Sequence, residues 1–295
     1  MEKNVSDILT RVRKIELKTR RLSDDLFGGA YHSSFKGRGM TFSEVRKYEY
    51  GDDVRTIDWN VTARNREPYS KVFEEERELT LMLVVDVSPS GIFSTSSQTK
   101  IEKSIEIAAI LAFSALQNND KVGLLAFSDE VELFIAPKKG KSHLLRIIRE
   151  LLVLGDIKRA KTPRGTNLSN AFSGISKYLK KRTIVFVLSD FIDENYERAL
   201  RIVNKRHDLN AICIYDANEF SLPNLGLVPF KDLESGKTEY VDTSSAELRK
   251  TYEKRIQEQR TYFEDTFKKI GAPVMRCELN ENHVKKLLGF FKSKT

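Results

Sequence analysis

The stretch Leu79–Gly91, with the sequence LTLMLVVDVSPSG, decides the fold of this 295-residue chain. Its first half is almost wholly apolar, which is typical of a strand buried on both faces of a parallel sheet. A proline and a glycine then end the strand. Ligands bind beyond the carboxyl ends of the strands in open α/β sheets, where Asp86, Ser88 and Ser90 are expected to lie. Such oxygen donors suit Mg²⁺, Mn²⁺ or Ca²⁺.

Apolar runs and helical spacing continue through the rest of the chain. Because strands and helices alternate from residue 79 onward, we expect an α/β fold with a doubly wound, mostly parallel sheet flanked by helices. A hairpin insertion is expected at about residues 221–243, with strands pairing over residues 227–240. Strands are expected at residues 122–127, 131–135, 183–188, 209–215 and 273–277, and helices at residues 100–117, 142–153, 168–179, 194–205, 244–269 and 282–291.

Two further loops bring oxygen donors to the same edge of this sheet. Thr166 precedes the helix expected from residue 168, and Asp190 follows the strand of residues 183–188. Each position also has a simpler interpretation, because Thr166 can cap its helix and Asp or Ser at a strand end can bond turn amides. The convergence of Asp86, Ser88, Ser90, Thr166 and Asp190 nevertheless predicts a metal site at one rim.

The N-terminal region, residues 1–78, has a different character. Residues 5–26 roughly follow helical spacing with a basic opposite face, and residues 31–78 indicate short strands and loops packed beside the main sheet. Trp59 is expected to anchor that packing. Asp52, Asp53 and Asp58 could be metal ligands, but turn caps and arginine pairs are the favoured interpretation. The sequence therefore predicts two regions. Residues 1–78 form a small helix-plus-β extension, and residues 79–295 form the sheet domain.

Composition is that of a soluble globular protein, with 40% hydrophobic and 31% charged residues. Of the net charge of +8, residues 1–78 carry +1 and residues 79–295 carry +7; neither part is a concentrated polycation, so nucleic acid is not expected as the main partner. No signal-like segment and no apolar run of the ~20 residues that span a membrane occurs, and the chain is expected to be cytoplasmic. Cys213 and Cys277 are expected to be free core thiols, and the four histidines have no ligand spacing.

The motifs D-V-S-P-S, R-G-T-N-L and L-S-D together resemble the metal-ion-dependent adhesion site (MIDAS) of von Willebrand factor A (vWA) domains. The resemblance covers residues 79–295 and implies a vWA or Rossmann-like sheet. It implies direct metal ligation by Ser88 and Ser90, with Thr166 and Asp86 ligating directly or through water and Asp190 through water. Two departures occur: Arg164-Gly165 stands where a glycine pair is common, and Phe191 where glycine is common.

A second resemblance covers nearly the whole chain. Residues 37–79, beginning GRGMTFSEVRKYEYGDDVRTIDW, and residues 222–243, LPNLGLVPFKDLESGKTEYVDT, resemble the signature of the domain-of-unknown-function-58 family. Members resemble soluble bacterial proteins that are often encoded beside a MoxR-type AAA+ ATPase. The resemblance supplies no biochemical activity.

These observations predict an adaptor that binds a partner's Glu or Asp through Mg²⁺, acting with a MoxR-type AAA+ ATPase in protein assembly or maturation. Only Asp86 and Asp190 would neutralise the ion, which could accept one more carboxylate. A magnesium-dependent hydrolase or phosphatase is the alternative, although Ser88 stands where aspartyl phosphotransferases have a second acid. No catalytic motif and no organic cofactor motif is found, so an enzyme is not expected. A nucleic-acid binder is the weaker alternative.

Overall fold

The computed structural model describes residues 10–17, 41–74, 79–92, 94–156, 165–231 and 237–294. The chain divides into two compact units, one of residues 35–79 and one that contains all other residues. The described N-terminal helix, residues 10–17, belongs to the unit that holds the main sheet, whereas the sequence division assigns it to an N-terminal region of residues 1–78. The predicted helical residues 5–9 and 18–26 lie outside the described residues.

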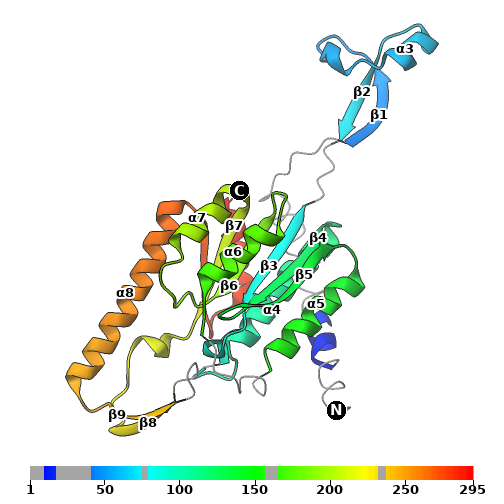
Figure 1. The fold of residues 1–295 in the computed structure, drawn as a ribbon. Helices are drawn as coiled ribbons and strands as arrows, with labels where there is room; N and C mark the ends of the chain where they lie inside the picture. The colour runs from blue at the N-terminus through cyan, green and yellow to red at the C-terminus, as the bar shows by residue number, and fades with distance from the viewer. Residues whose placement is uncertain are drawn as a thin grey trace. The chain divides into compact units, whose positions relative to one another are not determined.

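The main sheet has six strands in the order β10-β7-β6-β3-β4-β5 (Figure 1). Five are parallel, and β5 pairs antiparallel with β4 at one edge. The central strand β3 is buried along its length after Thr80, and Leu83 pairs with Leu124 on one side and Phe186 on the other. The predicted α/β, doubly wound, mostly parallel sheet is confirmed. The strands are β3 (Thr80–Asp86), β4 (Lys121–Phe127), β5 (Val131–Lys138), β6 (Ile184–Ser189), β7 (Asp208–Tyr215) and β10 (Val274–Glu278).

Helices cover both faces of this sheet (Figure 1). One face is covered by α4 (Lys100–Gln117), α5 (Lys141–Leu154) and α9 (His283–Lys294), and the other by α6 (Leu168–Tyr178), α7 (Glu197–Arg206) and α8 (Ala246–Ile270). Residues of alternating strand positions point to opposite faces. Phe186 of β6 therefore packs on Phe290 and Phe291 of α9, while Val185 and Val187 join the core beneath α6, α7 and α8.

The edge strand β5 is irregular. Its pairing with β4 shifts register twice, between Val122 and Leu124 and between Ala126 and Phe127, and Pro137 lies near its end. Gly123 of β4 permits this close packing, because a Cβ atom there would lie 2.9 Å from both the Ile135 carbonyl oxygen and the Pro137 ring. Cys213 in β7 and Cys277 in β10 are buried free thiols, as predicted.

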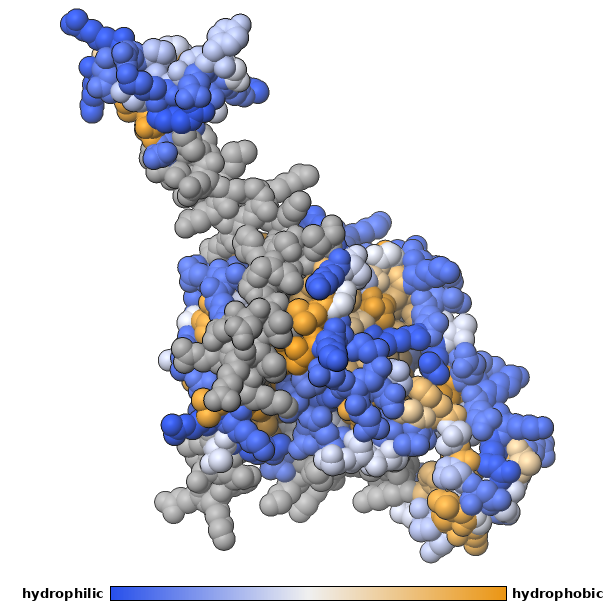
Figure 2. Space-filling view, turned by 180° about the vertical axis from the view of Figure 1, so that it is seen from behind, coloured by the Kyte–Doolittle hydropathy of each residue, from blue (hydrophilic) through white to orange (hydrophobic). Residues whose placement is uncertain are grey.

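A separate antiparallel hairpin, β8 (Leu227–Lys231) and β9 (Thr238–Asp242), lies within the predicted insertion. Its predicted turn at residues 234–236 lies outside the described residues. Figure 2 shows apolar side chains gathered at the lower right, where this hairpin lies. The large exposed apolar residues of this region are Leu225, Leu227, Phe230 and Tyr240.

The smaller unit contains the antiparallel pair β1 (Thr41–Lys47) and β2 (Tyr69–Glu74), with the 3₁₀ helix η1 (Val54–Thr56) and α3 (Trp59–Asn65) between them. Asp58 caps α3, as the favoured interpretation of the aspartates predicts. The other two pair with arginines, Asp52 with Arg46 at 2.7 Å and Asp53 with Arg55 at 2.8 Å.

The predicted anchoring role of Trp59 stays a prediction; its side chain is 67% exposed. Trp59 begins α3, a helix of seven residues that buries none of them.

Candidate functional site

Asp86 is the last residue of β3 and lies at the centre of the candidate site. It is 7% exposed. Its Oδ1 accepts a hydrogen bond of 2.9 Å from the backbone N–H of Ser88, and its Oδ2 accepts one of 2.7 Å from the hydroxyl of Ser189 at the end of β6. The carboxylate is therefore held between the ends of two neighbouring parallel strands.

Ser88 and Ser90 follow in the turn that enters the 3₁₀ helix η2 (Pro89–Ile92). Their hydroxyl oxygens lie 3.0 Å apart. The Ser88 side chain also interacts with Asp86, and the Ser90 side chain with Asp190; each interaction favours the ionised form of the carboxyl group. The structure thus brings four of the five sequence-predicted site residues into one continuous set of contacts.

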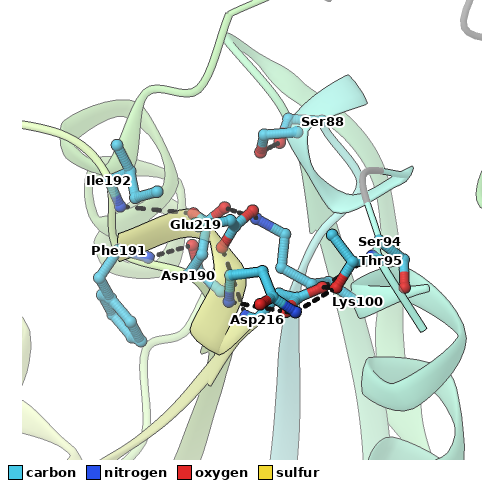
Figure 3. A network of polar contacts seen from close by, with 12 residues as sticks. Ser88, Ser94, Thr95, Lys100, Asp190, Phe191, Ile192, Asp216 and Glu219 are labelled. Atoms are coloured by element: carbon cyan, nitrogen blue, oxygen red, sulfur yellow. Dashed lines mark hydrogen bonds and ion pairs between the residues drawn. The ribbon is translucent and has the colours of Figure 1, made fainter. Parts of the chain in front are cut away.

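The ammonium group of Lys100, the first residue of α4, occupies the other side of Asp190 (Figure 3). Its Nζ donates to Asp190 Oδ2 at 2.8 Å and to Glu219 Oε1 at 2.6 Å. The side chains of Lys100 and Asp190 are each 4% exposed, and that of Glu219 is 13% exposed. A buried ammonium group therefore bridges two largely buried carboxylates that lie on different segments of the chain.

Glu219 lies in the 3₁₀ helix η4 (Ala217–Phe220), which connects this ion pair to two further segments. Asp216 caps η4 and accepts two hydrogen bonds of 2.7 Å from the backbone N–H and hydroxyl of Thr95 (Figure 3). The hydroxyl of Tyr252 in α8 donates to the Glu219 carbonyl at 2.9 Å. The loop around Thr95, η4 and α8 therefore form one hydrogen-bonded network with the site.

The two aspartates of the site differ in their electrostatic environment. Burial, and then the charge of Asp190, raise the pKa of Asp86 to about 6 from an ordinary value of 3.8. Burial opposes the ionisation of Asp190 as well, but the Lys100 ammonium outweighs it and lowers the pKa of Asp190. Burial raises the pKa of Glu219 in spite of Lys100. Lys100 therefore favours the ionised form of Asp190, and among the described residues no ion pair joins a basic side chain to Asp86.

Thr166, the fifth predicted residue, lies half-buried in the loop before α6. The helix cap is Asn167, whose side chain accepts a hydrogen bond from Asn170, so the interpretation of Thr166 as the cap is wrong. The reason is that the backbone N–H of Asn167 donates to the Ser128 carbonyl at 2.9 Å, which fixes Asn167 beside the end of β4. In the described part of the chain, no hydrogen bond joins Thr166 to the other four predicted residues.

Phe191 stands where glycine is common in vWA domains, and its backbone explains that preference. Its φ is 57°, in the left-handed region that is uncommon for residues other than glycine. Phe191 is 2% exposed and stacks on Phe263, with 4.7 Å between ring centroids. Burial of this ring offsets the cost of the backbone conformation that positions Asp190.

The residues present fit a small, hard cation. Within the described ranges, no group of three or more His, Cys, Asp or Glu side chains could hold a metal ion, so a cation here would also need hydroxyl ligands. Asp86, Ser88 and Ser90 supply one carboxylate and two hydroxyls in contact with one another. A carboxylate has about four acceptor positions, which leaves room beside its present hydrogen bonds. One oxygen of Asp190, however, is already bonded to Lys100.

Sequence reasoning missed Lys100, Glu219 and Ser189 as parts of this site. Ser189 directly precedes Asp190, but a serine at a strand end carries no distinctive pattern. Lys100 left one signal, because a positive charge in the first turn of a helix opposes the helix dipole and needs an acidic partner. The sequence does not indicate which of the 42 acidic residues is that partner.

Comparison with known proteins identifies the family. The family model described as "Protein of unknown function DUF58" matches residues 44–262. The chain belongs to this family. The predicted membership in the domain-of-unknown-function-58 family is thus confirmed, and the family's description assigns no activity.

Relatives and solved structures agree in leaving the function open. The uncharacterized protein Rv1480 of Mycobacterium tuberculosis is 27% identical over 286 residues, which cover 96% of this chain and 88% of that protein. The structure of the conserved hypothetical protein BatB from Bacteroides thetaiotaomicron is 14% identical with a TM-score of 0.46, covering 73% of this chain and 98% of BatB. The VWA domain of SpRpn10 is 11% identical with a TM-score of 0.37, covering 74% and 96% respectively. None of the helices in the described ranges has the length and apolarity required to cross a membrane.

Proposed function

We propose that this DUF58 protein is a metal-dependent adaptor that captures a Glu or Asp side chain of a partner protein. The observation that carries the proposal is the continuous contact between Asp86, Ser88, Ser90 and Asp190 at the carboxyl ends of β3 and β6. Mg²⁺, Mn²⁺ or Ca²⁺ are the cations that such oxygen donors prefer. The bound cation would supply a positively charged anchor for a carboxylate.

The electrostatics of Asp86 support this proposal. Its carboxylate is buried beside a second carboxylate, and burial and then the charge of Asp190 raise its pKa to about 6. A cation held by Asp86, Ser88 and Ser90 would supply a counterion. Thr166 enters the proposal as a further ligand, supplied by the loop that precedes α6.

The proposed role includes a specific partner protein and no catalytic reaction. The partner we propose is a MoxR-type AAA+ ATPase, with which the chain would act in the assembly or maturation of other proteins. We propose a binding protein because the hydrolase alternative requires a second acid two residues after the strand-terminal aspartate, where Ser88 stands.

Mn²⁺ titration by calorimetry at pH 7.5 tests the metal site. The wild type is expected to bind one Mn²⁺ per chain, and Asp86→Ala is expected to lose at least about tenfold in affinity. Asp265→Asn, on the exposed surface of α8, is the control and should bind as the wild type does. Equal Mn²⁺ binding by the wild type and Asp86→Ala would end the proposal.

A sedimentation experiment tests the partner. The purified chain and the MoxR-type ATPase encoded in the same genome should co-sediment with MgCl₂ and separate in EDTA, and Asp86→Ala should not co-sediment. Co-sedimentation that persists in EDTA would show that the interaction does not use the metal.

A further inference from the structure

We infer that the Lys100 ammonium is a resident cation that competes with a metal ion for Asp190 and thereby sets the metal affinity of the site. This inference rests on the proposed function, because it concerns the same rim of the sheet. Lys100 would act as a positioning residue that contacts neither the metal nor the partner. The carboxylate for which the two cations compete is that of Asp190, which contacts Ser90 on one side and Lys100 on the other.

The burial of Lys100 indicates that its contact with Asp190 is a specific part of the fold. Its side chain is 4% exposed, and a buried ammonium is retained only where acidic partners compensate its lost hydration. Lys100 also begins α4, where the helix dipole disfavours a positive charge. Neither hydration nor helix stability accounts for a lysine here, whereas two carboxylates at 2.8 Å and 2.6 Å do.

A charge count shows what Lys100 changes for an incoming cation. Asp86, Asp190 and Glu219 carry three negative charges when ionised, and Lys100 reduces the total to two. A divalent ion therefore neutralises the site without excess negative charge. Without Lys100 the site would hold a metal more tightly, but one negative charge would remain to repel a partner's carboxylate.

The second partner of Lys100 makes the competition reversible. If a metal takes Asp190, the ammonium still has Glu219 at 2.6 Å and is not left unpaired in the protein interior. Glu219 in turn is bound to α8 through its backbone carbonyl. A lysine with a single acidic partner would lack this second position, so the paired arrangement suits exchange between two cations.

Calorimetric Mn²⁺ titration of variants tests the inference with the metal alone as the probe. Lys100→Met removes the competing charge and is expected to bind Mn²⁺ at least about tenfold more tightly than the wild type. The double variant Lys100→Met/Glu219→Gln keeps the wild-type net charge, frees Asp190, and should remain several-fold tighter. Lys103→Met is the matched control, because Lys103 is also buried in α4 but bonds the carbonyls of Leu279 and Glu281. It should bind within about twofold of the wild type.

Each outcome separates this inference from the proposed function. Tighter binding in both Lys100 variants supports the competition, including the case in which only they bind Mn²⁺. Unchanged or weaker binding in folded Lys100 variants, with binding by the wild type, overturns the inference and leaves the proposed function intact. A return of the double variant to wild-type affinity would show that net charge alone acts, which also overturns it.

Thermal unfolding in EDTA, followed by circular dichroism, establishes that the variants fold. Removing Lys100 alone leaves two carboxylates, Asp190 and Glu219, without their ammonium partner. The double variant leaves only Asp190 in that state, so it remains informative if the single variant is unstable. Failure of the wild type and of every folded variant to bind Mn²⁺ would end the proposed function itself.

Discussion

Replacing Asp86 by Asn is expected to make the metal-free protein more stable at pH 7.5. The carboxylate is 7% exposed, and burial together with the charge of Asp190 raises its pKa from 3.8 to about 6. A carboxylic acid with a raised pKa binds its proton more tightly in the folded state than in the unfolded state. The free energy of unfolding therefore falls as the pH rises from about 3.8 to about 6. Above that range the whole destabilisation by the ionised carboxylate is present.

The magnitude follows from the same values. A difference of about two pKa units, each worth about 1.4 kcal/mol, corresponds to about 3 kcal/mol at pH 7.5. Asn keeps the shape and can accept the hydrogen bond from the Ser88 N–H, but it loses the charge-assisted bonds, which contribute about 1–2 kcal/mol. The net gain expected for Asp86→Asn is about 1–2 kcal/mol.

The assay is urea unfolding in EDTA at pH 7.5 and pH 4.5, followed by circular dichroism because the single Trp59 lies in the smaller unit. The advantage of Asp86→Asn should shrink or vanish at pH 4.5, where the wild-type carboxyl is largely protonated. Asp265→Asn should have no effect at either pH. A variant that is less stable than the wild type by about 1 kcal/mol at both pH values would refute this account of the buried charge. Addition of Mn²⁺ should stabilise the wild type and Asp265→Asn, but not Asp86→Asn, by about 2.7 kcal/mol at 100 times the dissociation constant.

Two other substitutions test the packing around the site. Gly123→Ala is expected to lower the free energy of unfolding by about 1–3 kcal/mol, because the new methyl group would lie 2.8 Å from Met82 and 2.9 Å from Pro137. Urea unfolding measures this change, and wild-type stability of the variant would contradict the packing. Asp216→Ala removes the acceptor of both Thr95 hydrogen bonds, so amide hydrogen exchange measured by mass spectrometry should rise over residues 94–98, and unchanged protection there would show that the contact does not order the loop.

The apolar strands of the sheet could be predicted because a strand buried on both faces consists of consecutive apolar residues. The runs at residues 79–85 and 183–188 contain enough branched and apolar side chains to indicate strands buried on both faces. The approximate position of Asp86 and Asp190 followed, since parallel strands bring their carboxyl ends to one edge. The structure places both aspartates there, linked through Ser88 and Ser90.

The partners of these aspartates could not be predicted in the same way. Lys100 and Glu219 lie 119 residues apart, and an ion pair leaves no periodic signal in the sequence. Thr166 and Asn167 are adjacent residues that can both cap a helix, and the tertiary bond from Asn167 to Ser128 decides between them. The role of Trp59 was predicted from residue type alone, and α3, which begins with it, buries none of its residues.

The irregular edge strand β5 has a consequence for self-association. An uncovered, regular strand edge is a template on which another copy can extend the sheet into a polymer. The two register shifts of β5 and its Pro137, which has no amide hydrogen, interrupt the row of donors along this edge. The antiparallel edge is thereby protected against fibril growth.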